Sequence, residues 1–584
     1  MSSQASSEIN FPRGILRPEL YIGDLSSVEA NVVRFSLTDA GSPSGAHFLG
    51  GRYGKGEVGE FVLIEGQTNL LLGRVVEIHL PEKERLSVTN SLNKKTTELD
   101  VVGTIQLLGS VAMDSLHVIT GVESYPRIGD RVYAAPHKFV ASLPSLMESD
   151  SNPEVDVLLD LGSIDAARER KVSVRPEKIF GRHCAILGAT GGGKSWTTAK
   201  LIEECLRYKS KTILIDATGE YREISGPDVD HVHLGAPVEK AMGSESKSLP
   251  ATSFIESDFV ALFEPAGKVQ GPKFRAAIRS LRLAKLRPSL APSGHIIKIG
   301  QSKLDVLSAE TEDGVTALLD DPRQEFDVEQ LVSQIEQECV YPEGFLQGGR
   351  RGEKDPNIWG GESGEFAYCL SLVSRINSIL TSPYFDCVFR SSDESLTKCI
   401  DDFVANDKKL LRICLSGVSY EFRAREIVAN VIGRHLLGMA RSSYFNTSPM
   451  VVLVDEAHNF LGREIGTEEV TVKLDAFELI AREGRKYGLN ICLATQRPRD
   501  ITDDVLSQIG TLIVHRLTND RDRSVVERAC GEIDRSASSF LPNLKPGEAA
   551  VIGVDFPIPL TIQITPPQNK PISDGPNFQR SWGT

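Results

Sequence analysis

Several short runs of consecutive apolar residues dominate the second two-thirds of this chain. Each is about as long as a strand, and unbroken aliphatic runs are typical of parallel strands covered on both faces. Helical patterns separate them, which predicts a doubly wound α/β core. The expected strands are Cys184–Leu187, Lys211–Asp216, Leu410–Leu415, Val451–Val454, Ile491–Thr495 and Thr511–Val514. The expected helices are Trp196–Leu206, Glu421–Arg441 and Lys473–Tyr487, the last ended by Gly488.

The first part of the chain has a different texture. Short β-branched and apolar runs alternate with Gly, Pro, Asp and Ser clusters, which favours a small barrel or a sandwich. The expected strands there are Val28–Leu37, Gly59–Ile64, Leu70–Leu80, Asp100–Leu108 and His117–Val122. A polar link from Leu143 to Pro153 follows.

These patterns predict a RecA-like P-loop α/β core with an N-terminal small β-barrel and a helical insertion. The expected domains are a barrel with its linker, two parts of the ATPase core flanking a mainly helical insertion, and an extended tail. Their boundaries are 1–150, 151–255, 256–400, 401–567 and 568–584. Two strands are expected near the end of the core, Ala549–Val554 and Leu560–Ile564, broken by Pro557 and Pro559.

The composition limits the class of protein and its location in the cell. The net charge of −14 argues against a surface that coats nucleic acid broadly, but permits a local basic channel. No apolar run reaches the roughly 18 residues that span a bilayer, and the polar start lacks a signal peptide's apolar core. The nine cysteines are scattered, as in a reduced protein. We therefore expect a cytoplasmic protein with no membrane association.

A glycine-rich segment after the first core strand carries the strongest chemical signal. It matches the G-x-x-x-x-G-K-[ST] pattern between a strand and a helix, where backbone N–H groups surround phosphate oxygens. Lys194 is expected to reach the β- and γ-phosphates, and Ser195 to bind Mg²⁺. The predicted ATP-binding segment comprises Gly188, Ala189, Thr190, Gly191, Gly192, Gly193, Lys194, Ser195 and Trp196.

Two carboxylates follow the apolar run Val451–Val454 and complete the pattern of a Walker B motif. Acids at the carboxyl end of a parallel strand lie where ligands bind in open α/β sheets. Asp455 is expected to hold Mg²⁺, directly or through water, and Glu456 to polarise the attacking water.

Other polar residues near strand ends are weaker candidates. Gln496 follows a buried strand and could contact the γ-phosphate or water. Arg482 and Arg485 share one helical face and could be arginine fingers, or could merely stabilise the end of a helix. Arg182, before the first strand, could be a phosphate contact in cis or a structural ion pair.

A basic run in the insertion has two readings, DNA contact or the solvated face of a helix, and the second is favoured. It comprises Lys268, Lys273, Arg275, Arg279, Arg282, Lys285 and Arg287. The segment Asp455–His458 spells D-E-A-H, but no second core with helicase motifs accompanies it.

Taken together, these motifs resemble the HerA branch of the HerA–FtsK hexameric ATPases. The resemblance rests on Gly188–Ser195, Asp216–Tyr221, Asp455–Leu461, Arg482–Gly488 and Ala494–Pro498. The family commonly has Asp-Pro-His-Gly-Glu-Tyr where this chain has Asp-Ala-Thr-Gly-Glu-Tyr, which leaves Asp216 and Glu220 as expected nucleotide-site residues.

The resemblance also implies roles. Lys194, Ser195, Asp455, Glu456 and Gln496 would form the cis site, with Arg182 as a cis arginine and Arg482 or Arg485 as the trans finger. The cofactors would be ATP and Mg²⁺, and the assembly a homohexamer with duplex DNA in its central channel. A separate effector, a nuclease or a sirtuin-like enzyme, would dock near the barrel, in DNA-end processing or antiviral defence.

Three functions remain open at this stage. The first is a DNA-translocating motor or helicase, and the second is an ATPase platform that scaffolds and activates an effector without processive translocation. A remodelling ATPase that does not act on DNA is the third. The tail keeps two aromatic residues, Phe578 and Trp582, which predict either an arm that braces neighbouring protomers or a disordered end.

Overall fold

The structure is a computed structural model of the chain. It describes residues 15–37, 46–48, 51–54, 56–80, 101–147, 157–164, 171–345, 354–389, 394–467, 470–530, 540–572 and 582. The chain divides into two compact units, which are treated separately below. The first contains residues 1–208, 494–499 and 506–568, and the second contains residues 209–493, 500–505 and 569–584.

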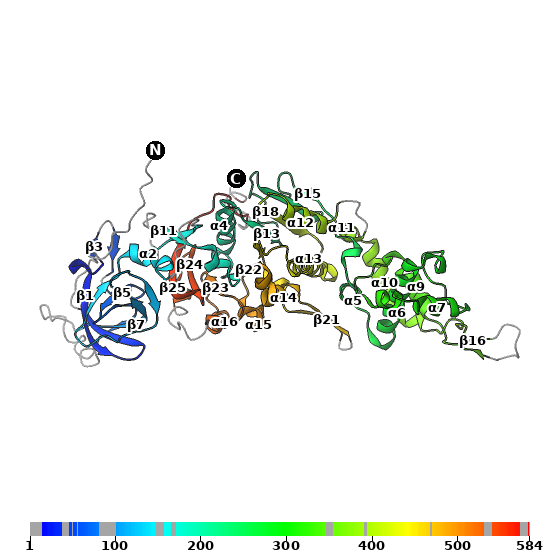
Figure 1. Cartoon of the computed structure of the whole chain (residues 1–584), viewed down its shortest axis with the longest axis horizontal. Coiled ribbons are helices and arrows are strands. Elements are labelled where there is room, and N and C mark those ends of the chain that lie inside the picture. The colour runs from blue at the N-terminus through cyan, green and yellow to red at the C-terminus, as the bar shows by residue number, and fades with distance from the viewer. Residues whose placement is uncertain are drawn as a thin grey trace. The chain divides into compact units, whose positions relative to one another are not determined.

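The first unit begins with a closed β-barrel (Figure 1). Six strands follow the order β2-β1-β9-β5-β6-β7, and a β2–β7 pairing closes the ring, with β8 beside β7. All pairings are antiparallel. The strands are β1 (Tyr21–Val28), β2 (Val32–Leu37), β5 (Phe61–Glu65), β6 (Leu70–His79), β7 (Val101–Val111), β8 (Val118–Thr120) and β9 (Arg131–Ala134), with a small hairpin of β3 (Ala46–Phe48) and β4 (Gly51–Tyr53).

The barrel follows from alternation in these strands. Inward-facing apolar residues such as Phe35, Val62, Leu71 and Ile105 form one buried cluster. The barrel reading is therefore confirmed over the sandwich. The sequence pattern did not predict β1, β9 or the β3–β4 hairpin. The expected link from Leu143 was partly wrong, because helix α2 (His137–Leu146) runs into it.

The rest of the first unit is a mixed sheet with the strand order β11-β10-β25-β24-β23-β12. β12 (Cys184–Leu187) and β23 (Thr511–Val514) are parallel, as the sequence predicts. The other pairings, for which the sequence predicts no direction, are antiparallel. The remaining strands are β10 (Leu159–Ser163), β11 (Lys171–Val174), β24 (Glu548–Gly553) and β25 (Phe556–Ile564), which includes both Pro557 and Pro559.

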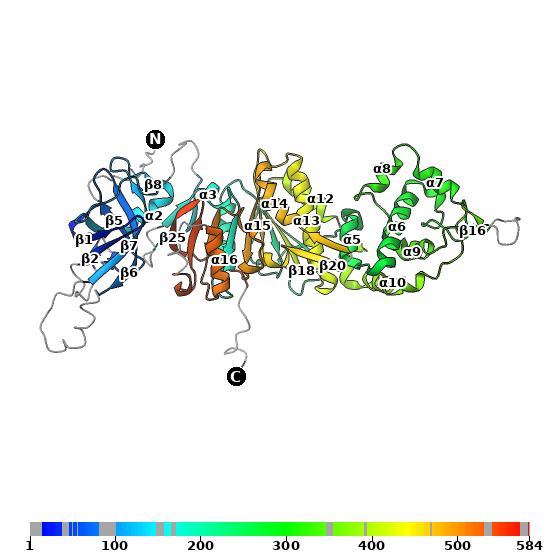
Figure 2. The ribbon, with the colours of Figure 1, turned by 90° about the horizontal axis from the view of Figure 1, so that it is seen from below.

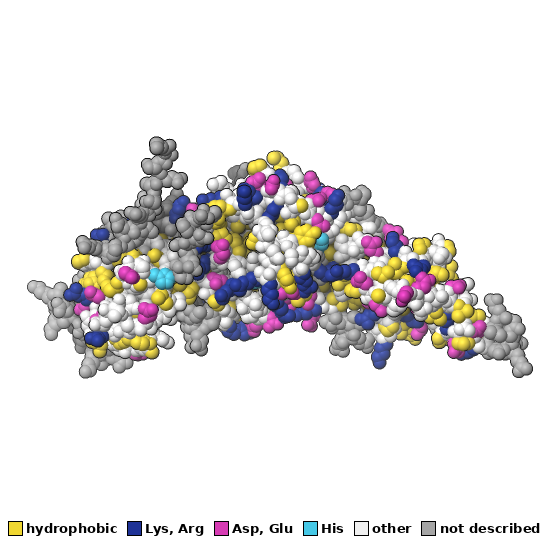
Figure 3. Space-filling view, in the orientation of Figure 1, with side chains coloured by type: hydrophobic (Ala, Val, Ile, Leu, Met, Phe, Trp, Pro, Cys, Tyr) yellow, Lys and Arg dark blue, Asp and Glu magenta, His cyan; other side chains and the backbone are white. Residues whose placement is uncertain are grey.

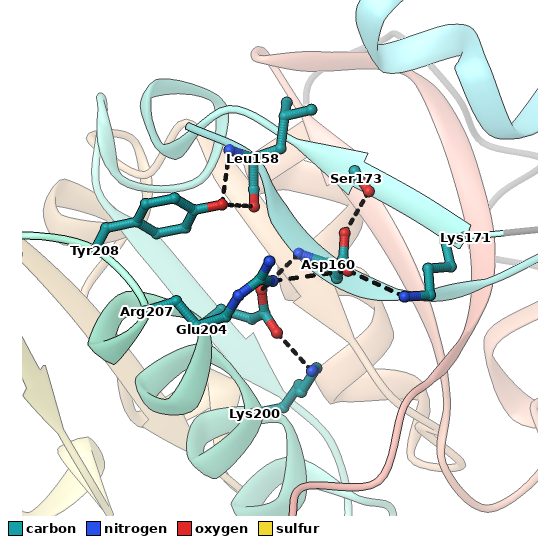
Figure 4. A network of polar contacts seen from close by, with 8 residues as sticks. All are labelled: Leu158, Asp160, Lys171, Ser173, Lys200, Glu204, Arg207 and Tyr208. Atoms are coloured by element: carbon teal, nitrogen blue, oxygen red, sulfur yellow. Dashed lines mark hydrogen bonds and ion pairs between the residues drawn. The ribbon is translucent and has the colours of Figure 1, made fainter. Parts of the chain in front are cut away.

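Helix α4 (Lys194–Leu206) starts after the glycine-rich segment, and its far end is anchored to β10. The Glu204 carboxylate is buried, lies 2.7 Å from Lys200 Nζ, and also pairs with Arg207 (Figure 4). It accepts a hydrogen bond from the Asp160 N–H at 3.0 Å. Because Asp160 pairs in turn with Ser173 and Lys171 of β11, this network fixes the helix against the sheet edge.

The second unit is built on parallel strands in the order β22-β19-β13-β18-β14-β15. They are β13 (Lys211–Asp216), β14 (Val229–Gly235), β15 (Glu245–Ser246), β18 (Leu410–Gly417), β19 (Met450–Val454) and β22 (Leu489–Thr495). Helices α12 (Leu396–Ala405), α13 (Ala424–Arg441) and α14 (Ala476–Glu483) accompany them. The aliphatic strands are almost fully buried, as parallel strands require.

Helices dominate the chain between β15 and β18, which agrees with the expected insertion (Figure 2). A second apolar cluster, which includes Leu283, Ile296 and Leu319, forms within it. Its helices are α5 (Glu256–Phe263), α6 (Gly267–Leu286), α7 (Leu304–Glu310), α8 (Val315–Asp320), α9 (Leu331–Glu338), α10 (Phe366–Thr381) and α11 (Asp386–Phe389), with a short hairpin of β16 (Gly344–Phe345) and β17 (Lys354–Asp355).

One expected helix began too early. The segment from Lys473 is the end of strand β21 (Val470–Leu474), which pairs with β20 (Arg463–Thr467), and α14 starts at Ala476. A 3₁₀ turn from Gly484 to Tyr487 continues the helix, and Gly488 ends it at φ 75°, as the sequence predicts.

Two further observations bear on the expectations from composition. None of the helices in the described residues is both long and apolar enough to cross a bilayer. Eight cysteines within the described ranges are free thiols, and seven of these are buried. The predicted domain boundaries themselves stay predictions.

The buried Glu204 network generates a stability test. Glu204→Gln removes the negative charge that faces Lys200 and Arg207 in a site with little solvent. We expect the free energy of unfolding to fall by about 2 to 4 kcal/mol. Glu29→Gln, which removes the acid of an exposed pair with Arg34, is the matched control and should cost less than about 1 kcal/mol. Thermal unfolding of both variants checks this, and equal midpoints would contradict it.

Candidate nucleotide site

The phosphate loop of the first unit has the backbone shape that an anion cradle needs. Gly191 and Gly193 adopt φ of 73° and 114°, in the left-handed region that favours glycine. The Gly192 N–H donates to the Ala189 carbonyl at 3.0 Å, and the Ala189 N–H donates to the Arg516 carbonyl at 3.1 Å. The loop is thus a defined turn at the N-terminus of α4, where backbone N–H groups and the helix dipole favour phosphate.

Lys194 and Ser195 occupy the first positions of α4, where both side chains are partly exposed. Lys194 Nζ lies 3.5 Å from the Ala189 carbonyl oxygen and so remains folded over the loop. Trp196 is likewise partly exposed, while Thr197 is buried. The helix therefore begins with the residues that the motif assigns to phosphate and Mg²⁺.

Gln496 belongs to the same unit as the loop and contacts it directly. The Thr190 hydroxyl donates to the Gln496 Oε1 at 2.6 Å. Gln496 follows β22 immediately, so the end of that strand and the loop meet through this bond. The structure brings these two predicted site residues together.

A buried histidine, His515, lies behind the loop and was absent from the sequence candidates. Its Nδ1 is 2.9 Å from the Glu548 carbonyl oxygen, and its Nε2 is 2.8 Å from the Thr197 hydroxyl. Because a carbonyl only accepts, Nδ1 carries the proton and Nε2 accepts from Thr197. Burial, with a smaller contribution from the nearby Lys194 charge, lowers the pKa of His515 to about 4 despite the hydrogen bond to Glu548, so the ring is neutral near pH 7.

Arg182 does not reach the loop. It precedes β12, whereas the loop follows β12, so the length of this strand separates them, roughly 13 Å. Its Nε lies 3.6 Å from the Asp555 carboxylate. The structure therefore supports the ion-pair reading of Arg182 and shows no contact that would make it a phosphate ligand within its own unit.

The second unit holds the two acids that follow β19. Asp455 is buried, and its N–H donates to the Ile215 carbonyl at 3.1 Å. Burial raises the pKa of the Asp455 carboxyl well above its ordinary value, and the Asp216, Glu220 and Glu456 carboxylates raise it further. A concentration of acidic oxygens of this kind suits a hard divalent cation.

Glu456 has an unusual backbone. Its φ of 48° lies in the left-handed region, which is costly for a residue other than glycine and is common at functional sites. One carboxylate oxygen lies 3.2 Å from His458 Nδ1, and the side chain is only partly exposed. The strand end thus turns sharply at the residue predicted to polarise water.

The Asp216 carboxylate accepts hydrogen bonds from neighbouring backbone groups and pairs with an arginine. Its two oxygens accept from the N–H groups of Gly219 at 2.7 Å and Tyr221 at 3.1 Å. Arg412 of β18, itself buried, pairs with it at 2.7 Å. These contacts fix the turn that carries Glu220, whose carbonyl accepts from the Ile572 N–H at 2.8 Å.

The two candidate arginine fingers differ in their surroundings. Arg482, near the end of α14, pairs with Asp504 at 2.7 Å. Arg485 lies in the following 3₁₀ turn, is exposed, and makes no side-chain hydrogen bond or ion pair with the residues that the structure describes. Figure 3 shows basic side chains gathered over the region that Figure 1 labels α13 and α14.

The basic run of the insertion lies on α6 and at Arg287 directly after it, and acids of the insertion neutralise most of it. Its pairs are Lys273 with Glu365, Arg275 and Arg282 with Glu256, Arg279 with Glu310 and Asp320, and Arg287 with Glu312. Arg282 is also buried. These pairs favour the structural reading of the run over DNA contact.

Sequence reasoning also missed Arg412, although a signal for it existed. It is a charged residue within the aliphatic run Leu410–Leu415, and a buried charge needs a partner. His515 carried a comparable signal, a polar residue placed directly after a buried strand.

Among the residues that the structure describes, no group of three or more His, Cys, Asp and Glu could hold a metal ion. In the tail, Gln568 N–H donates to Glu203 at 3.0 Å and Trp582 is exposed, whereas Phe578 lies outside the described residues.

Comparisons with known proteins point to one family. The family model "Helicase HerA, central domain" matches residues 159–356. A probable DNA double-strand break repair helicase HerA of Methanocaldococcus jannaschii is 24% identical over 422 residues, covering 70% of this chain and 76% of the relative. The DNA double-strand break repair helicase HerA of Sulfolobus acidocaldarius is 24% identical, covering 76% of this chain and 77% of the relative.

Among solved structures, the bacterial plasmid coupling protein TrwB, in complex with a non-hydrolysable ATP analogue, matches with a TM-score of 0.41. The two sequences are 15% identical, and the match covers 69% of this chain and 89% of the TrwB chain. VirB4 of Thermoanaerobacter pseudethanolicus matches with a TM-score of 0.37 at 16% identity. The match covers 72% of this chain and 98% of the VirB4 chain.

The neutral state of His515 generates a pH test. Its pKa in the folded protein, about 4, lies below the ordinary 6.5. The neutral ring therefore stabilises the fold fully above pH 6.5, and this contribution is lost as the pH falls toward 4, up to about 3 kcal/mol.

The test compares the wild type with the variant His515→Asn, whose asparagine side chain does not titrate. We expect the difference in unfolding free energy between the wild type and this variant to shrink between pH 6.5 and 4. Chemical denaturation at several pH values measures this difference. A constant difference across that interval would show that His515 does not titrate as its burial implies.

Proposed function

We propose that this chain, which is similar to HerA helicases, is a Mg²⁺-dependent ATPase that uses hydrolysis to move along duplex DNA. The observation that carries the proposal is the phosphate loop, with left-handed Gly191 and Gly193 leading into Lys194 at the start of α4. This is the arrangement in which backbone N–H groups and a lysine bind the phosphates of a nucleotide.

Each residue of the proposed site has a separate task. Lys194 binds the β- and γ-phosphates, and the N–H groups of Gly191–Lys194 surround the phosphate oxygens. Glu456 orients and polarises the attacking water, and Gln496, held by Thr190, contacts the γ-phosphate or that water.

The donor set suits magnesium. Ser195 offers a hydroxyl oxygen and Asp455 a carboxylate, and Mg²⁺ prefers few protein oxygens beside phosphate and water. Ser195 and Asp455 would hold the ion, which would supply positive charge to offset the negative charge of the phosphates. We assign Asp216 and its partner Arg412 to holding the turn of Glu220 beside Asp455, because both Asp216 oxygens already accept protein donors.

The proposal extends to assembly and partners. We propose that Arg485 is the trans arginine finger, because it is exposed and has no side-chain partner among the described residues, whereas Arg482 pairs with Asp504. A site that needs a neighbour's arginine is complete only in a ring, for which the family resemblance suggests a homohexamer around duplex DNA. A separate nuclease or sirtuin-like effector would act with this ring, in the cytoplasm.

Two relatives support the DNA part of the proposal, since one is a DNA double-strand break repair helicase and the other a probable one. The alternative function is an ATPase platform that activates an effector without processive translocation. The neutralised basic run of α6 is the observation that favours it, because that surface offers little net charge for phosphate contacts.

Displacement of a third strand from a triplex by the moving protein separates the two functions. A motor should displace it only when MgATP is present, and Lys194→Ala should abolish displacement. A platform should hydrolyse ATP yet displace nothing. The second outcome would refute translocation while leaving the ATPase assignment intact.

The catalytic assignment makes a prediction for single variants. Glu456→Gln keeps the size of the side chain but removes the charge that orients water, so ATP should bind while turnover falls roughly 100-fold. Lys194→Ala should lose binding itself. Phosphate release at saturating ATP is the measurement, and Glu464→Gln at an exposed position is the control. Wild-type turnover in Glu456→Gln would contradict the assignment of Glu456 as the residue that orients water.

The trans arginine makes a mixing prediction. Arg485→Ala and Glu456→Gln damage different subunits' contributions to one site, so a random equal mixture should restore both intact contributions at about a quarter of sites. Turnover should then exceed that of either variant alone. Lys486→Ala serves as a neighbouring exposed control. A mixture no more active than its components would place Arg485 outside the neighbouring site.

A further inference from the structure

The back of the phosphate loop packs against His515 so closely that side chains are excluded there. A Cβ added to Gly188 would lie 2.6 Å from the His515 Cβ, closer than real atoms approach. A Cβ on Gly193 would lie 3.1 Å from the ring. The loop therefore has a rigid surface behind it, and that surface is the histidine side chain.

The ring also ties together two segments that flank the loop. Nδ1–H donates to the Glu548 carbonyl at the start of β24, and Nε2 accepts from Thr197 in the first turn of α4. Both nitrogens are used, and the side chain is fully buried, so the ring has one orientation and one tautomer. A histidine held in this way can transmit a shift of β24 to α4.

A second contact joins the same segment to the loop. Gly547, which precedes Glu548, has φ 78°, and its N–H donates to the Gly192 carbonyl at 3.4 Å. Its Cα would lie 3.4 Å from a Cβ on Gly193. The loop thus rests on residues 547 and 548 as well as on His515.

The chain just before this support contacts the barrel. The Arg74 guanidinium of β6 lies 4.3 Å from the centre of the Phe540 ring and donates to the Thr561 hydroxyl of β25 at 3.3 Å. Arg74 is almost completely buried. Next to Phe540, the Leu541 carbonyl accepts from the Leu517 N–H at 3.3 Å, two residues after His515. A continuous set of contacts therefore runs from the barrel to the phosphate loop.

We propose that His515 is a positioning residue for the phosphate loop, and that residues 540–548 extend this support to the Arg74 contact of the barrel. The inference rests on the proposed nucleotide binding by the loop and names what keeps the loop in its binding shape. Its consequence is that a change in the barrel at Arg74 alters nucleotide affinity without touching the nucleotide.

The first arm of the test measures the dissociation constant for MgATP by fluorescence titration. His515→Leu removes both hydrogen bonds and should weaken binding about 10-fold or more, which corresponds to two lost hydrogen bonds. His515→Asn keeps a donor for Glu548 and should weaken binding less. Thr197→Val removes the hydroxyl but keeps the shape, and combined with His515→Asn it should add little, because both remove the same bond.

A purely structural role for His515 predicts something different. The variants would then unfold at lower temperature but bind MgATP with unchanged affinity well below that temperature. Such a result would overturn the positioning role. The wild type and Lys194→Ala are the reference pair, since failure of the wild type to bind MgATP would refute the proposed function instead.

The second arm tests whether the support of the phosphate loop extends to the barrel. Arg74→Met keeps the side-chain length but loses the guanidinium on Phe540, and should weaken MgATP binding about 3-fold or more. Arg34→Met replaces an exposed barrel arginine and should leave binding unchanged. Unchanged affinity in Arg74→Met would overturn the extension to the barrel and confine the support to His515.

Discussion

The close fit between the phosphate loop and the end of β23 is the constraint on which the rest of the site depends. No side chain fits between Gly188 and His515, and Gly191 and Gly193 adopt backbone angles that other residues strongly disfavour. With those glycines in place, Lys194 starts α4 above the loop and Thr190 reaches Gln496. The anchored far end of α4, through Glu204, keeps that geometry from depending on the loop alone.

In the second unit, the structure must accommodate several negative charges that lie close together at the ends of parallel strands. Asp216 is the last residue of β13, Asp455 follows the neighbouring strand β19, and both are buried. Arg412 balances Asp216 directly, whereas the pKa of Asp455 is raised by burial and by the acids around it. The left-handed backbone of Glu456 adds local strain, which persists only where the surrounding structure enforces it.

Most of this architecture could be predicted because its signals are local. Cys184–Leu187, Lys211–Asp216 and Thr511–Val514 are strands with the expected ends, since aliphatic runs bounded by polar residues leave little choice. The barrel was recognisable as β structure, but its closure depends on the β2–β7 pairing between distant segments. The antiparallel strands β24 and β25 carry no local mark of their direction.

The parts of the site that escaped prediction depend on contacts distant in sequence. His515 gains its role only from Thr197 and Glu548, and Arg412 only from Asp216. Arg182 is near the loop in sequence, yet it lies at the other end of β12, where it pairs with Asp555. The difference between Arg482 and Arg485 likewise appears only when Asp504 is seen beside the first of them.

ATP turnover measured across a range of duplex DNA concentrations tests the central claim most directly. If this chain is a DNA-driven ATPase, turnover in the presence of Mg²⁺ should rise with duplex concentration to a plateau, and added salt should weaken the response as phosphate contacts are screened. Turnover that is already maximal without DNA, and unchanged by any concentration of duplex, would contradict the account.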